Sequence, residues 1–98
     1  MIEYQVTSWR EIPSMVAARE GDTVVKVPLP ARFQEAIDEA AMRVGATDSE
    51  AYLDGWTRGE WTMPAREPDH PTDLADHVAR ELDETWDQAA ISAYLESL

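Results

Sequence analysis

The sequence predicts an α+β fold: a small antiparallel sheet of about three to four strands, packed against an amphipathic helix and followed by C-terminal helices. Three patterns support this class. Apolar and polar residues alternate from Ile2 to Val6, which is the period of a half-buried strand. Two β-prone runs flank Gly21-Asp22. Apolar residues recur at helical spacing between Phe33 and Val44, as in an amphipathic helix.

Residues 2–27 are expected to form three antiparallel strands. Trp9 extends the first alternation after a change of register. Ile12-Pro13 is interpreted as a corner, because proline lacks an amide donor and disfavours helix in the preceding residue. The two runs on either side of the Gly-Asp step then form a hairpin. Residues 57–63 are a candidate last strand at an edge of the sheet.

The clearest helix is expected at residues 31–44. Pro30 suits the first turn of a helix, and Gly45 is a natural stop. A short helix at 48–54 should follow, with Thr47 as the first residue of a capping box.

Composition divides the chain into a mixed N-terminal part and an acidic C-terminal part. Residues 67–98 hold nine acids and one base, which predicts a solvated helix face or a docking surface for a basic partner. Thr72 is expected to cap this helical part, and a second possible cap at Thr85 leaves open whether it is one helix or two. The predicted units are an α+β domain at 1–63, a Pro-rich connector at 64–71 and an acidic helical segment at 72–98.

The overall composition excludes several classes of function. The 98 residues include no cysteine, which excludes disulfides and a thiolate nucleophile. The net charge of −12 repels nucleic-acid phosphates. No apolar run approaches the roughly 18 residues of a membrane span, and the N-terminus lacks the basic start and apolar run of a secretory signal. We expect a cytoplasmic protein without nucleic-acid or membrane partners, and the oligomeric state stays open.

The sequence contains no recognisable catalytic constellation. His70 and His77 do not have the spacing that places two metal ligands on one helical face. No Gly-x-Ser-x-Gly is present, and the glycines form neither a P-loop nor a dinucleotide fingerprint. The sequence therefore predicts no catalytic residues, no metal and no cofactor, and it argues against an enzyme.

Arginines near aromatic residues are the remaining candidates for a binding site. An Arg beside a Trp can stack on the ring and still bind a carboxylate or phosphate. The competing interpretation is that the arginines form structural ion pairs, which contribute only about 0–1 kcal/mol at a surface. Trp9 is also expected to close the sheet against the first helix. The candidate binding residues are Trp9, Arg10, Arg32, Arg43, Tyr52 and Trp56.

Three blocks of the sequence resemble the bacterial virulence factor domain family. They are Trp9-Arg10-Glu11-Ile12-Pro13, then residues 29–38 with Ala41-Met42-Arg43, and finally Glu50-Ala51-Tyr52-Leu53 with Trp56. The resemblance covers about residues 2–61, so residues 62–98 are expected to be a lineage-specific tail. It implies no particular reaction or cofactor. It does associate short members with gene neighbourhoods for corrinoid- and folate-dependent one-carbon metabolism, although the Asp-x-His-x-x-Gly pattern of a corrinoid-binding domain is absent.

Two functions are predicted from these observations. The first is a non-enzymatic binding or accessory module that acts in a protein complex. An exposed apolar patch containing Trp56, Trp61 or Trp86 would mark it. The alternative is a subunit that binds a small anionic ligand, or an accessory subunit in corrinoid- or folate-linked one-carbon metabolism. A pocket in which the candidate arginines converge with Tyr4 or Tyr52 would mark this alternative.

Overall fold

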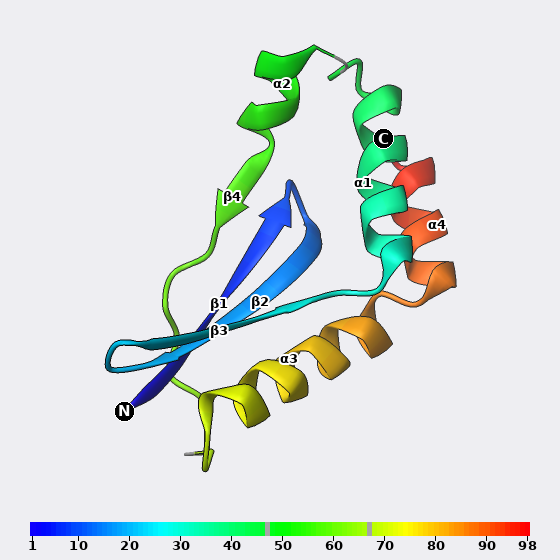
Figure 1. Cartoon of the computed structure of the whole chain (residues 1–98). Helices are drawn as coiled ribbons and strands as arrows, with labels where there is room; N and C mark the ends of the chain where they lie inside the picture. The colour runs from blue at the N-terminus through cyan, green and yellow to red at the C-terminus, as the bar shows by residue number, and fades with distance from the viewer. Residues whose placement is uncertain (47, 67) are drawn as a thin grey trace.

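In the residues that the structure describes, the fold is one four-stranded sheet with four helices around it, which confirms the α+β class. The computed structural model describes residues 1–46, 48–66 and 68–98. The strands are antiparallel and their order is β3-β2-β1-β4. In Figure 1, α3 runs along the sheet, while α1 and α4 lie side by side at one end of it. The elements are β1 (Ile2–Trp9), β2 (Ile12–Glu20), β3 (Thr23–Pro28), α1 (Ala31–Arg43), α2 (Ser49–Asp54), β4 (Trp56–Arg58), α3 (Pro71–Thr85) and α4 (Gln88–Glu96).

The first hairpin turns at Arg10 and Glu11, so the predicted corner at Ile12-Pro13 is wrong. Both of those residues already belong to β2 and are buried. Arg10 takes the left-handed backbone conformation, with φ of 53°. Pro13 lies opposite Ser8, next to a shift of register in the ladder. A strand tolerates proline at such an irregularity, because the regular pattern of amide donors is already interrupted there.

The second hairpin forms as predicted. Gly21 has a φ of 59°, a conformation that glycine adopts without steric cost, and Glu20 pairs with Thr23 across the turn. The last strand is shorter than the predicted 57–63. β4 pairs with the end of β1. Beyond it, the Gly59 N–H donates to the Val6 carbonyl at 2.9 Å, and an isolated bridge joins Thr62 to Tyr4.

Helix α3 covers one face of the sheet. Alternating residues of β1 and β2 form a buried cluster with α3, in which Ile2, Val16 and Ala18 contact Leu74 and Ala75. The sequence assigned the role of covering helix to residues 31–44, but α1 packs mainly at the end of the sheet. The C-terminal part of the chain therefore shares a hydrophobic core with the sheet.

A second cluster joins the end of the sheet to α1 and α4. It contains Trp9 and Ile12 from the first hairpin, Phe33 and Ile37 from α1, and Ile91 from α4. Trp9 is completely buried, so the predicted contact between this residue and the first helix is present.

The two early helices start close to the predicted positions. α1 begins directly after Pro30. Asp48 caps α2, because its side chain accepts a hydrogen bond of 2.7 Å from the Ala51 N–H. Thr47, the predicted cap, lies outside the described residues.

The acidic C-terminal segment forms two helices, which answers the question that the sequence left open. α3 begins at Pro71 with His70 as its N-cap, so Thr72 is not the cap. Proline is favoured at the first helical position because its missing N–H is not needed there. The break comes at Trp86, and the Asp87 carboxylate then caps α4 by accepting the Ala90 N–H at 2.9 Å. In the described part of the chain, no helix has the length and apolar character needed to cross a membrane.

Candidate functional site

Three of the predicted site residues form an aromatic cluster beside the first hairpin. The rings of Trp9 and Tyr52 stack with their centroids 5.9 Å apart, and Trp56 meets Tyr52 edge-on at 6.0 Å. Trp9 Nε1 donates a hydrogen bond of 2.7 Å to the Tyr52 carbonyl. Gly55 lies so close to the Trp9 ring that an added Cβ would come within 2.4 Å of it. These contacts hold α2 and β4 against the end of β1.

Arg10 belongs to the same cluster. Its main-chain N–H donates to the Gly55 carbonyl at 2.8 Å, and this hydrogen bond helps to hold the left-handed backbone of the turn. Its guanidinium lies 5.4 Å from the centre of the Trp9 ring, within the range of a cation–π contact. Arg10 is exposed, and it forms no ion pair with any residue in 1–46, 48–66 or 68–98.

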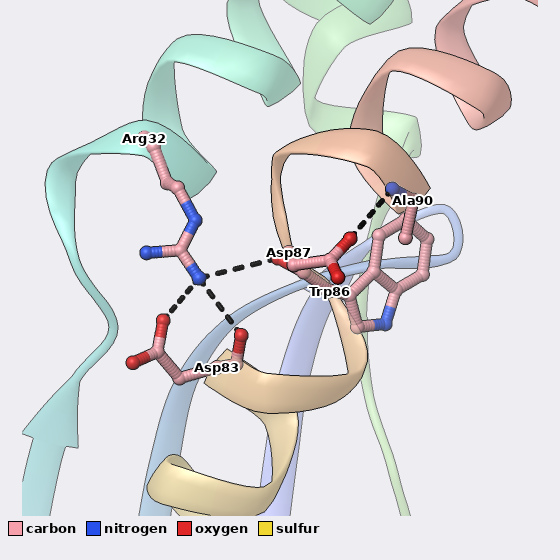
Figure 2. A network of polar contacts seen from close by, with 5 residues as sticks. All are labelled: Arg32, Asp83, Trp86, Asp87 and Ala90. Carbon is pink, nitrogen blue, oxygen red and sulfur yellow. Dashed lines mark hydrogen bonds and ion pairs between the residues drawn. The ribbon is translucent and has the colours of Figure 1, made fainter.

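Arg32 binds the junction between α3 and α4. Its Nη2 atom donates to the Asp83 carboxylate, to the Asp83 carbonyl at 2.8 Å and to the Trp86 carbonyl at 3.2 Å. Figure 2 shows these three contacts, together with the Asp87 cap that starts α4. The side chain also lies over the Phe33 ring, with 4.8 Å between the guanidinium carbon and the ring centre. Arg32 therefore fixes the position of the C-terminal helices relative to α1.

Arg43 makes a related contact at the other end of α1. Its Nε donates to Glu39 at 3.0 Å, and its Nη1 donates to the Leu95 carbonyl near the end of α4 at 2.9 Å. Both side chains of the Arg43–Glu39 pair are 42% exposed, so solvent weakens this ion pair more than that of Arg32.

A polar contact that the sequence did not predict joins the first hairpin to α4. The Tyr94 hydroxyl donates to the Glu11 carboxylate. Burial raises the pKa of Tyr94 to about 12, and the hydrogen bond to Glu11 and its negative charge act in the same direction. Tyr94 also meets Trp86 edge-on at 5.5 Å. Helical spacing placed Tyr94 on one face of the C-terminal segment, but no local pattern links it to residue 11.

The six candidate residues therefore lie in two groups with different contacts. Trp9, Arg10, Tyr52 and Trp56 surround the first hairpin, whereas Arg32 and Arg43 hold the C-terminal helices by contacts with the same chain. The acidic partner of Arg32 is Asp83, which belongs to the acidic C-terminal segment of the same chain.

Two of the hollows in the described part of the structure contain a tyrosine that the sequence named as a possible pocket residue. The larger has a volume of about 670 Å³ and includes Tyr4, but none of the candidate arginines. The smaller, of about 370 Å³, includes Tyr52 and also none of them. The tryptophans proposed to mark a protein-binding patch, at positions 56, 61 and 86, are all half-buried. Neither of these two hollows is thus the expected pocket of converging arginines, and the exposed apolar patch stays a prediction.

Among residues 1–46, 48–66 and 68–98, no three His, Asp or Glu side chains are placed to hold a metal ion. Tyr94, whose pKa is raised by burial, is engaged with Glu11.

Comparison with known proteins places most of the chain in one family. No curated protein and no solved structure matches the chain. The family model described as "Virulence factor" matches residues 7–94. The match extends far beyond residue 61, so the expectation that residues 62–98 are a lineage-specific tail is wrong, and α3 and most of α4 lie within the matched residues. Since the match covers nearly the whole length, the chain belongs to the virulence factor family.

Proposed function

We propose that this chain is a non-catalytic binding module that acts in a protein complex, and that it binds its partner through the outer edge of β3. The observation that carries this proposal is the position of β3, which has β2 on one side and no strand on the other in the described part of the chain. An unpaired edge is a template on which a partner adds a strand through main-chain hydrogen bonds.

The register of the hairpin identifies the amides that point outward. A two-residue turn closes with a hydrogen-bonded pair, here Glu20 and Thr23. Hydrogen-bonded pairs then recur at every second residue of β3, and the Leu29 N–H continues this phase by donating to the β2 residue Ser14 at 3.0 Å. The N–H and C=O groups of Val24 and Lys26 therefore point away from β2.

Charge favours a different protein over a second copy as the partner. α3 packs on the face of the sheet that includes β3, and it carries five acids and one arginine. Two copies paired symmetrically at β3 would bring these acidic helices together, which is unfavourable. Lys26 lies in the middle of the edge, a position where a charged side chain discourages self-pairing.

Two variants of Lys26, one with proline and one with threonine, test this proposal. Lys26→Pro removes an outward amide donor but leaves the ladder with β2 intact, whereas Lys26→Thr removes the same charge and keeps the donor. We expect a partner captured by the wild-type chain to bind Lys26→Thr and to be lost with Lys26→Pro, both variants being folded by circular dichroism. Hydrogen exchange should show new protection at Val24 and Lys26 in the complex. Equal binding of both variants, or no captured partner, contradicts the proposal.

The alternative, a small anionic ligand held by the candidate arginines, has weaker support. Such a ligand would have to displace Asp83 from Arg32, or Glu39 and a backbone carbonyl from Arg43. No observation on the described residues favours corrinoid- or folate-linked chemistry over other roles. A cytoplasmic location and the absence of nucleic-acid partners stay predictions from composition and charge.

A further inference from the structure

The larger hollow is a cleft between the first half of α3 and the segment that precedes it. Its walls are mainly apolar: Leu74 and Val78 come from α3, and Pro64, Ala65 and Pro68 face them from the preceding segment. Tyr4 of β1 closes one side. The volume of about 670 Å³ lies within the range of roughly 300–1,000 Å³ that is typical of small-molecule sites.

Three polar residues of the cleft lie along one stripe of α3. Asp73, His77 and Glu81 all line it and are spaced four residues apart, so they occupy one face of the helix. The His77 ring contacts the Glu81 carboxylate. Asp73 makes no ion pair with any residue in the described ranges. Arg66 is the other charged residue in the lining.

The spacing of the two carboxylates indicates the shape of the ligand. Asp73 and Glu81 are eight residues apart, which corresponds to about 12 Å along a helix. The apolar side chains of Leu74 and Val78 line the same cleft between these two positions. A molecule that fits this arrangement has a cation at each end and an apolar chain in the middle.

We propose that this cleft binds a linear organic diamine, with one ammonium at Asp73, the other at Glu81 and the methylene chain against Leu74 and Val78. The acidic C-terminal part of the chain, with nine acids and one base in residues 67–98, attracts such a dication as it approaches. The ammonium at Glu81 replaces the contact of that carboxylate with His77.

The probe is 1,8-diaminooctane, whose extended chain separates its two nitrogens by a distance similar to that between Asp73 and Glu81. Its affinity for the full chain is measured by calorimetry and compared with that of 1-aminooctane and 1,8-octanediol. We expect the diamine to bind at least about tenfold more tightly than either compound. Methyl signals of Leu74 and Val78 should shift on binding. Equal affinity for the monoamine overturns the two-ended mode, and failure to bind the diamine overturns the site.

Matched variants separate the cleft from the general attraction of an acidic protein for cations. Asp73→Asn and Glu81→Gln each remove one negative charge inside the cleft. We expect each substitution to lower the affinity for the diamine to the affinity for the monoamine. Asp76→Asn and Glu84→Gln remove the same charge from α3 outside the lining, where both residues are exposed. These controls should bind as the wild type does. Equal losses in both sets mean that binding is non-specific and overturn the proposal.

Discussion

Arg32 at the start of α1 donates hydrogen bonds to both the side chain and the main-chain carbonyl of Asp83, near the end of α3. The same nitrogen reaches the Trp86 carbonyl, which lies at the break between α3 and α4. One guanidinium thus fixes two helices of the acidic segment against the helix that follows the sheet.

Arg32→Ala should lower the free energy of unfolding by about 1.5–3 kcal/mol, because a carboxylate and two carbonyls lose their charged donor. Urea unfolding measures this loss. Arg43→Ala is the matched control: its ion pair is more exposed, and we expect a loss below about 1 kcal/mol. Equal losses for the two variants would mean that the contacts of Arg32 at the α3–α4 junction stabilise the fold no more than the exposed contacts of Arg43.

Gly55→Ala should destabilise the aromatic cluster. The new Cβ would lie 2.4 Å from Nε1 and Cε2 of Trp9, and overpacking of this kind costs about 1–3 kcal/mol. Gly59→Ala is the control, since its Cβ would lie 3.4 Å from its nearest neighbour, the Val6 carbonyl. Thermal unfolding and the near-ultraviolet signal of the tryptophans report the effect, and an unchanged signal in Gly55→Ala would contradict the packing.

Local patterns predicted the elements of this fold better than their positions in space. Alternation identified β1, and helical spacing identified α1. The turn at Arg10 was missed because a left-handed arginine has no sequence signature, whereas a proline suggests a corner. The length of β4 was overestimated. Its regular pairing with β1 ends at Arg58, and beyond that residue an isolated bridge joins Thr62 to Tyr4.

The candidate site was predictable only in part, for a physical reason. Adjacent aromatic and basic residues in the sequence indicated the cluster around Trp9. The partners of Arg32 and Arg43 lie 51 and 52 residues away along the chain, and such contacts depend on how whole helices pack. The cleft along α3 was missed for the same reason, because its walls come from β1, the preceding segment and α3.

Phe33→Ala should cost about 3–5 kcal/mol, because Phe33 is 1% exposed and lies in the cluster that joins α1 to the sheet. Met42→Ala on the exposed side of the same helix should change stability by less than about 0.5 kcal/mol. Both values come from urea titrations. A cost below about 1 kcal/mol for Phe33→Ala would mean that the buried face of α1 is assigned incorrectly.

The stability of the protein should fall at high pH as Tyr94 ionises. Its pKa is raised from 10.0 to about 12 by burial and by Glu11. A group whose pKa is raised in the folded state contributes stability below its unfolded pKa and loses it as the pH rises through the folded value. The loss should therefore begin near pH 10 and continue to about pH 12.

Absorbance at high pH follows this ionisation directly. Tyr94→Phe should remove the component that titrates near pH 12 and should flatten the decline of stability over the same interval. Loss of a component that titrates near pH 10 instead would show that burial and Glu11 do not raise this pKa.

The predicted domain 1–63 should not fold by itself, although composition marks it as a separate unit. Such a fragment lacks Leu74 and Ala75, which pack on Ile2, Val16 and Ala18. Exposure of buried aliphatic side chains costs about 1.5–3 kcal/mol each, and several of these together equal the roughly 5–15 kcal/mol that stabilises a typical small protein. We expect the fragment to unfold without a cooperative transition and to bind a hydrophobic dye. Addition of a 64–98 peptide should restore cooperativity, because α3 again covers the sheet. A fragment that unfolds as sharply as the full chain would instead establish 1–63 as an independent domain, and α3 would then stabilise the sheet without being required for it.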